Sequence, residues 1–321
     1  MNHKKNYRLP ALLVCLVLLL SGCSIKDPLF LANESRKDQI SGPVSEQNEA
    51  VYDWQGQGIL LITDAEETSN EAVNAIAALL YSLDSDKAYF AKSADRKLRP
   101  AELTYLFTAY TALQYIRPDT VVTVQKEALE NVNGFDVIGL HEGDQVTAED
   151  LLCGMLRGGA DAARALALAC AGSEEEFVSR MNAHTKACGC MDTSFANVIG
   201  RDDSDQYTTV YDVYLLMHRL ARDTRFMKAF SADNEEITVQ RAGLDTPIHL
   251  APVQDAEGGI DVPAGLNMVG LLEGSSSQAG YCMSMITEDG AGKRSLMVIL
   301  CAWSPSGMHD QAEELFKLEE N

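Results

Sequence analysis

The sequence predicts an α+β fold, in which one antiparallel sheet is flanked by helices and a separate lobe is all-helical. Segments of strand character lie near both ends of the apolar part of the chain. Segments with apolar residues at helical spacing lie between them. Because strands from both ends bury their apolar faces best in a shared sheet, the helices between them are expected to cover that sheet.

The first two strands are expected close to residue 75. Ala75–Ser82 is apolar, the polar stretch 84–87 reads as a turn, and AYFAK at 88–92 provides the second strand. Pro100 then opens a helix that extends to Leu113, since proline is favoured in a first helical turn.

Later segments follow the same patterns. Thr147 is an expected N-cap for the helix TAEDLLCGML, and Gly158-Gly159 separates that helix from DAARALALACA. Further helices are expected at Glu174–Ala187, Thr209–Asp223 and Asp310–Leu318, and strands at Gly270–Leu272, Gly280–Met285 and Ser295–Ala302.

The N-terminus has the pattern of an export signal. A short basic region is followed by the apolar run Leu9–Leu20, which is shorter than the roughly 20 residues of a membrane span. The run ends in Leu-Ser-Gly-Cys, which is typical of a bacterial lipobox and predicts a signal peptide at 1–22 and lipidation of Cys23. The alternative is an ordinary export signal with an incidental cysteine. Lipidation would anchor the protein to the outer face of the cell membrane.

Residues 23–57 are polar and of mixed composition, which predicts a flexible tether, and 58–321 is expected to form the folded domain. Without residues 1–22 the chain has 23 Lys and Arg against 47 Asp and Glu, a net charge of −24. Nucleic acid is therefore excluded as a partner, because binding to it depends on cations that meet phosphates. The same charge argues that acyl chains, and not a basic patch, hold the protein at the membrane.

Six cysteines remain when Cys15 and Cys23 are set aside, and most of them lie in apolar stretches. Buried free thiols are the simplest interpretation. Cys188-Gly189-Cys190 has no second pair of ligands close by in the sequence, so we expect neither a metal site nor a cofactor.

Several blocks follow one another in an order that indicates a known family. They are RPAELTYLFTAYTAL, VIGLHEGDQVTAEDLL, GGADAARALA, MNAHTKACGCMDTSFAN and GSSSQAGYCM. Together they resemble the D-alanyl-D-alanine carboxypeptidases, low-molecular-mass penicillin-binding proteins. The resemblance implies the serine β-lactamase-like transpeptidase fold over roughly residues 75–316.

In active members of that family three motifs meet in one cleft: Ser-x-x-Lys, Ser-x-Asn and Lys-Thr-Gly. The resemblance implies that the serine attacks the peptide carbonyl, the first lysine takes its proton, and the last lysine binds the substrate carboxylate. Each motif is altered in this chain. Glu102 and Tyr105 stand for serine and lysine, Gly158 and Ala160 for serine and asparagine, and Leu272, Glu273 and Gly274 for Lys-Thr-Gly.

These replacements argue against the family's reaction. Attack by Glu102 on an amide would give a labile anhydride, and the Tyr105 phenol, with an ordinary pKa near 10, is a poor base. A structural interpretation is that Glu102 opposes the helix dipole and Tyr105 fills the space of the lysine. A cleft holding Glu102 and Glu273 would repel a substrate carboxylate.

Three functional hypotheses remain. The first is a non-catalytic envelope lipoprotein that binds peptidoglycan stem peptides or envelope proteins. The second is an active serine-type D-Ala-D-Ala carboxypeptidase with a relocated nucleophile such as Ser276, which lies near the expected cleft. The third is a structural surface lipoprotein without a ligand.

Overall fold

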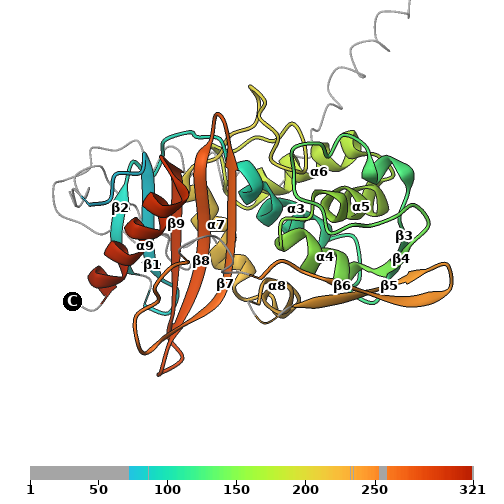
Figure 1. Ribbon diagram of the computed structural model, residues 1–321. Coiled ribbons are helices and arrows are strands. Elements are labelled where there is room, and N and C mark those ends of the chain that lie inside the picture. Colours follow the sequence, from blue (N-terminus) through green and yellow to red (C-terminus); the bar gives the residue numbers. More distant parts are fainter. Residues whose placement is uncertain (1–71, 86, 232, 234, 253–258, 320–321) are drawn as a thin grey trace, which may run out of the picture. The chain divides into compact units, whose positions relative to one another are not determined.

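A computed structural model describes residues 72–85, 87–231, 233, 235–252 and 259–319 (Figure 1). These residues all belong to the larger of the chain's two structural units, Glu46–Asn321. The principal sheet has five antiparallel strands in the order β2-β1-β9-β8-β7, so segments from both ends of the described chain share it, as predicted. The strands are β1 (Ala77–Ser82), β2 (Lys87–Lys92), β7 (Leu266–Ser276), β8 (Gly280–Asp289) and β9 (Arg294–Ala302).

Both faces of this sheet are covered, which explains why its inner strands are continuous apolar runs. Along β9, Leu296 and Val298 belong to the core shared with the helices of the lobe, including α7 (Val210–Leu220). Met297 and Ile299 belong to a second core with Leu315 of α9 (Pro305–Glu319). Alternate side chains therefore pack on opposite faces, as the two-residue period of a strand requires. Figure 1 shows α9 running across the strands of the sheet.

The remaining helices form the lobe that faces the other side of the sheet. Three helices in the described part of the lobe begin at a hydroxyl cap: the hydroxyls of Thr147, Ser173 and Thr209 each accept a hydrogen bond from the backbone N–H three residues later. The Thr147 cap is the one that the sequence predicts. The lobe contains η2 (Ala101–Leu103), α3 (Thr104–Ala112), η3 (Lys126–Leu129), α4 (Ala148–Leu156), α5 (Ala160–Ala171), α6 (Glu174–Ala187) and α8 (Thr224–Phe230).

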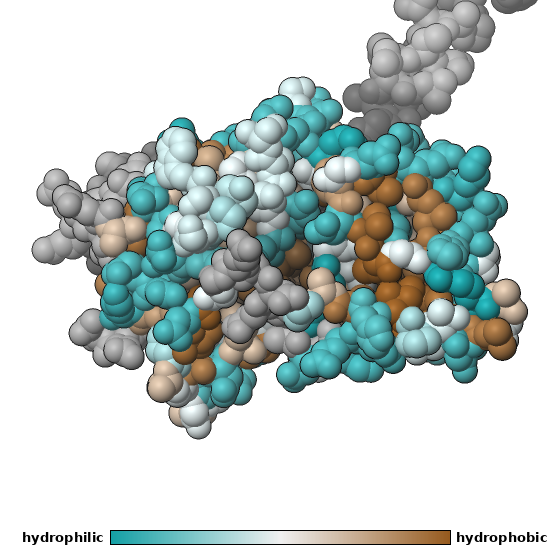
Figure 2. All heavy atoms as spheres, viewed as in Figure 1, coloured by the Kyte–Doolittle hydropathy of each residue, from teal (hydrophilic) through white to brown (hydrophobic). Residues whose placement is uncertain are grey.

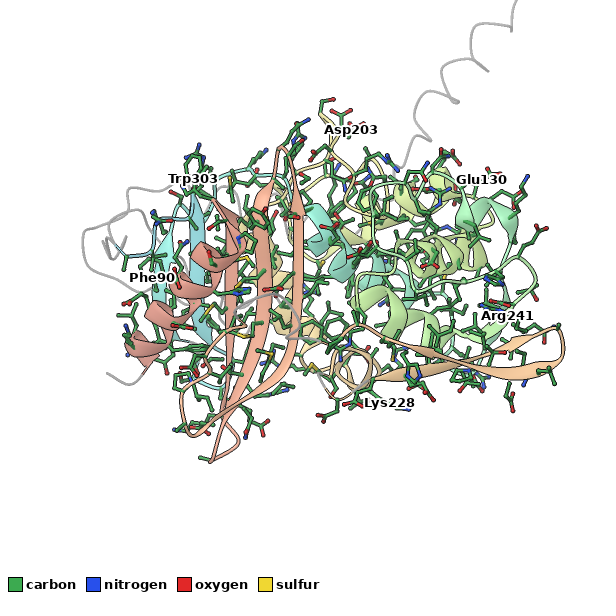
Figure 3. All side chains as sticks on the ribbon, viewed as in Figure 1. Phe90, Glu130, Asp203, Lys228, Arg241 and Trp303 are labelled. Atoms are coloured by element: carbon green, nitrogen blue, oxygen red, sulfur yellow. The ribbon has the colours of Figure 1, made fainter. Side chains whose placement is uncertain are left out.

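The lobe also carries a second, four-stranded sheet that the sequence does not predict. Its order is β3-β4-β5-β6, with strands β3 (Val121–Thr123), β4 (Gln145–Thr147), β5 (Glu236–Arg241) and β6 (Leu244–His249). Arg241, labelled in Figure 3, forms two hydrogen bonds of 2.9 and 2.7 Å with the buried carboxylate of Asp144. Burial alone would raise the pKa of the Asp144 carboxyl. The hydrogen bonds and the positive charge of Arg241 act in the opposite direction, and the pKa is lowered. This ion pair fixes the small sheet to the loop that precedes β4.

Figure 2 shows apolar side chains gathered over the part of the lobe where α4 and α5 lie, beside a mainly hydrophilic surface. Among the described residues, no helix combines the length and the apolar character that a membrane crossing needs. The predicted signal peptide, the predicted lipidation site Cys23 and the predicted tether lie outside the described residues.

Candidate active site

A cleft of about 260 Å³ lies where the edge strand β7 meets the start of α3 and the loop between α4 and α5. It brings together residues from all three altered motifs: Glu102, Gly158, and Glu273 with Gly274. A smaller cleft of about 190 Å³ shares Gly158 and Glu273 and adds Leu272. The structure thus assembles positions that are up to 172 residues apart in the sequence. The remaining lining of the larger cleft is Asp136, Ser275, Tyr281, Pro305 and Met308.

The backbone around Glu102 is held in an unusual shape. Ala101, which precedes it, has a φ of +47°, in the left-handed region that non-glycine residues rarely adopt. Two glycines permit the close packing around this turn. A Cβ at Gly200 would overlap the Ala101 carbonyl, and a Cβ at Gly274 would lie 2.6 Å from the Glu102 nitrogen. Such strain at a cleft is typical of a functional site.

The half-buried carboxylate of Glu102 turns back to the edge strand. Its Oε2 accepts a hydrogen bond of 2.7 Å from the Ser275 backbone N–H. Burial raises its pKa to about 7, the backbone N–H groups of Glu102 and Ser275 oppose that rise, and the nearby carboxylates of Asp136 and Asp202 add to it. Glu102 lies in the first turn of η2, where the sequence placed it at a helix start. Burial nevertheless raises the pKa of its carboxyl, because it outweighs the backbone donors.

Tyr105 lies one turn after Glu102, with its side chain fully buried. Its hydroxyl donates to the Gly158 carbonyl over 3.4 Å, so the side chain reaches from α3 to the loop of the second motif. Burial raises the pKa of Tyr105 well above its ordinary value, and Glu102 adds to the rise. The phenol therefore keeps its proton at neutral pH and does not serve as a base.

The second altered motif offers a turn without reactive side chains. Gly158 has a φ of +94°, and Gly159 precedes the first residue of α5, the fully buried Ala160. The buried carboxylate of Asp161 accepts hydrogen bonds of 3.0 to 3.1 Å from the N–H groups of residues 138–140. Asp161 thus anchors the loop that carries Asp136 against α5. The loop is a tight glycine turn, and none of the motif positions Gly158, Gly159 and Ala160 carries a hydroxyl or an amide side chain.

The third altered motif places its two side chains on opposite faces of β7. Leu272 packs in the core shared with the lobe and also lines the smaller cleft. Glu273 lies on the α9 side, where its Oε1 is 2.7 Å from Nε2 of the buried His309. The sequence did not indicate this pairing, because 36 residues separate the two positions. Among the charged residues that line the two clefts, the only cation within the described part of the chain is Arg157, which donates to the Ser231 carbonyl.

Ser276, the candidate replacement nucleophile, is engaged in a local turn. Its hydroxyl donates to Asp202 Oδ1 over 2.6 Å and accepts from the Ala279 N–H over 2.9 Å. Arg99 donates to the carbonyls of Asp203 and Gln206, which fixes the loop that carries Asp202; Asp203 is labelled in Figure 3. The role of Asp202 was not foreseen from the sequence.

The thiols and the acidic groups do not form a metal centre in the part of the chain that the structure describes. The six cysteines predicted to be free thiols are free, with four buried and Cys170 and Cys301 half-buried. The sulfurs of Cys188 and Cys190 are 3.9 Å apart, and Cys190 donates to the Asp212 carbonyl. Burial raises the pKa of Cys282 to about 12, which makes that thiol unreactive.

Comparison with known proteins agrees with this architecture. The model of the D-alanyl-D-alanine carboxypeptidase family matches residues 64–303. D-alanyl-D-alanine carboxypeptidase DacC of Escherichia coli is 31% identical over 76% of this chain and 60% of its own length. DacF of Bacillus subtilis is 26% identical over 80% of this chain and 67% of its own length. The chain thus spans about two thirds or less of these relatives.

The crystal structure of the Streptomyces K15 DD-transpeptidase has the same fold, with a TM-score of 0.68 and 21% identity, over 77% of this chain and 97% of that chain. The fold predicted from the ordered sequence blocks is therefore confirmed. With the family model covering most of the chain, the protein belongs to the D-alanyl-D-alanine carboxypeptidase family.

Proposed function

We propose that this chain is a non-catalytic member of its family that acts in binding at the cell envelope. The observation that carries the proposal is the state of Glu102. At the nucleophile position there is a half-buried carboxylate that accepts a hydrogen bond from the Ser275 N–H. Covalent acyl transfer needs a hydroxyl or a thiol at that place, and a carboxylate would yield only a labile anhydride.

The groups around Glu102 support the same conclusion. A serine-type mechanism needs a base next to the nucleophile and a cation for the substrate's terminal carboxylate. Tyr105 is buried with a raised pKa, and Leu272 replaces the cation with an apolar side chain. Asp136 and Glu273 line the larger cleft instead, so no cation is found there among the described residues to hold the substrate carboxylate that the reaction requires.

The proposed place of action follows from the N-terminal sequence. A lipid on Cys23 would hold the protein at the outer face of the cell membrane, and residues 24–57 would separate the domain from the bilayer. The partner is then a component of the same compartment, either a peptidoglycan stem peptide or an envelope protein.

An active carboxypeptidase that uses Ser276 is the second candidate. The short hydrogen bond from Ser276 to Asp202 favours it, because a carboxylate in this position can accept the proton of a hydroxyl. The same hydroxyl accepts the Ala279 N–H, however, which orients it within the turn.

Release of D-alanine from a peptide that ends in D-Ala-D-Ala distinguishes the two candidates. The purified chain and its Ser276→Ala variant are incubated with the peptide, and free D-alanine is measured against a sample without protein. We expect both proteins to equal the blank, since neither contains an activated nucleophile. Release by the wild-type chain that disappears in Ser276→Ala would establish the second candidate instead.

A further inference from the structure

Two thiols, those of Cys188 and Cys190, lie in contact at the C-terminal end of α6, far along the chain from the altered motifs. The helix ends in a turn at Gly189, whose φ of +86° is left-handed. The N–H groups of Gly189 and Cys190 donate to carbonyls of the last helical turn over 2.9 and 3.1 Å. The turn brings the two sulfurs to 3.9 Å. A disulfide would need them to approach by roughly 2 Å more, a movement that rotation of the side chains can supply.

The two thiols differ in their surroundings. Arg219 of α7 donates a hydrogen bond of 3.0 Å to the Cys188 carbonyl, which places a positive charge beside that residue. A hydrogen bond from Cys190 lowers the pKa of the Cys188 thiol, burial opposes this, and the Arg219 charge adds to the lowering. Burial raises the pKa of Cys190 well above its ordinary value, and its thiol donates to the Asp212 carbonyl over 3.3 Å. Cys188 is thus the better nucleophile of the pair.

The other thiols in the described part of the chain do not share these features. Burial raises the pKa of each to about 12 in Cys153, Cys170 and Cys282, and it also raises the pKa of Cys301. Of the six thiols, only that of Cys188 has a lowered pKa. This contrast separates the pair from cysteines that serve only as small apolar side chains.

We propose that Cys188 and Cys190 form a reversible thiol–disulfide site, which a low-molecular-mass disulfide oxidises and a thiol reduces. In the first step the Cys188 thiolate attacks one sulfur of the external disulfide, whose S–S bond breaks, and one thiol leaves with the proton that Cys188 has lost. In the second step Cys190 loses its proton and attacks the Cys188 sulfur, so the mixed disulfide breaks and the second thiol leaves with that proton. The chain gives up two electrons and two protons, and the external disulfide becomes two thiols.

The pair lies directly beneath the surface. Both side chains are buried, but Ala187 and Met191, next to them in the sequence, are exposed. Helix ends open locally at a small cost in free energy, so opening at the end of α6 gives an oxidant access to Cys188. The export signal predicted at 1–22 would place the chain in a compartment where disulfides form and persist.

Oxidation would affect the start of α7. Closure of the disulfide removes the Cys190 proton that is donated to the Asp212 carbonyl. The segment that follows Cys190 also holds the Asp212 side chain, because the Asp192 N–H and the Thr193 hydroxyl donate to Oδ2 over 2.9 and 2.6 Å. A disulfide would tie this segment to the end of α6. This role is separate from the cleft and does not depend on the proposed binding function.

Peptide mapping of the full chain tests the proposal. The folded protein is reduced, freed of reductant and incubated with oxidised glutathione, and the remaining thiols are alkylated under denaturing conditions. Trypsin cuts after Lys186 and Arg201, so both cysteines are recovered in one peptide, residues 187–201. We expect this peptide to carry no alkyl group and to be about 2 Da lighter than its reduced form. Treatment with dithiothreitol before alkylation should restore an alkyl group on each cysteine.

Two single variants separate the steps. Cys190→Ser lacks the second thiol and should retain glutathione on Cys188 as a mixed disulfide. Cys188→Ser should react at Cys190 at least about tenfold more slowly, because that thiol keeps its proton. Both effects follow from the assignment of Cys188 as the attacking thiol.

The buried thiols of Cys153 and Cys282 are matched controls within the same protein and should be alkylated in full. Complete alkylation of both cysteines in the 187–201 peptide of the folded wild-type chain would overturn the proposal. Oxidation of Cys153 and Cys282 at the same rate as the pair would also overturn it. Both results are read from the wild-type chain, so they hold whether or not the variants fold.

Discussion

The triple variant Glu102→Ser, Tyr105→Lys, Leu272→Lys is expected to become covalently labelled by a fluorescent penicillin. The backbone of the cleft already holds these positions together. Tyr105 lies one turn from Glu102 and reaches the Gly158 carbonyl, so a lysine at 105 spans the same gap. Leu272 lines the smaller cleft, where a lysine would supply the missing cation.

Removal of the Glu102 carboxylate also releases the Ser275 N–H for the oxygen of an incoming acyl group. Loss of a nucleophile or its base costs on the order of 10⁶ in rate in a well-studied serine hydrolase. The rate of covalent labelling in the triple variant should therefore exceed the background rate of the wild-type chain by several orders of magnitude, even if the restored site is imperfect.

Labelling is read as a fluorescent band after denaturation. The matched control is the single variant Glu102→Ser. It has a hydroxyl at position 102 but no lysine at position 105 and should show no fluorescent band. Tyr105→Lys buries a charge, so circular dichroism and cooperative unfolding of the triple variant are checked first. A folded triple variant that takes up no penicillin would mean that the loss of activity extends beyond these three side chains.

Glu102→Gln is expected to stabilise the folded chain at neutral and alkaline pH. The folded-state pKa of about 7 lies above the ordinary value of 4.5, because burial disfavours the charged form. Stability from the bound proton is complete below pH 4.5 and is lost as the pH rises through about 7. The full loss is about 3 kcal/mol, at about 1.4 kcal/mol per pKa unit. Glutamine does not titrate, so it avoids this loss.

The free energy of unfolding of both proteins is measured by denaturant titration from pH 4.5 to pH 8.5. The free energy of unfolding of Glu102→Gln, relative to that of the wild-type chain, should rise by about 3 kcal/mol across this pH range. Asp212, whose pKa is raised to about 7 mainly by burial, titrates in both proteins and cancels. Glu130→Gln, at an exposed position, provides a matched control. It should change the free energy of unfolding by less than about 0.5 kcal/mol. Parallel pH profiles for wild type and Glu102→Gln would refute the buried, proton-binding state of Glu102.

The elements that the sequence predicts are those with long periodic patterns. The α3 region, α4 to α7 and the sheet strands near both ends were found because each buries many apolar side chains. The small sheet was missed: β3 and β4 have three residues each, too short for a two-residue period, and Pro247 lies within β6. β7 is longer than the predicted Gly270–Leu272, because its start alternates only weakly between buried and exposed residues.

The candidate site was predictable only where a motif could be recognised in order along the chain. Positions 102, 105, 158 and 272–274 were placed by the ordered blocks, and the structure gathers most of them around the adjoining clefts. Asp202 and His309 escaped prediction, because each meets its partner only through tertiary packing. The raised pKa of Glu102 is likewise a product of burial and of neighbours distant in sequence.

Exposure of the wild-type chain to a fluorescent penicillin, followed by measurement of its intact mass, is the most direct test of the central claim. The triple variant serves as the positive control. The absence of a serine or thiol at position 102 predicts an unchanged mass. A stable penicilloyl adduct on the wild-type chain, at Ser276 or any other residue, would contradict the claim that this family member is non-catalytic.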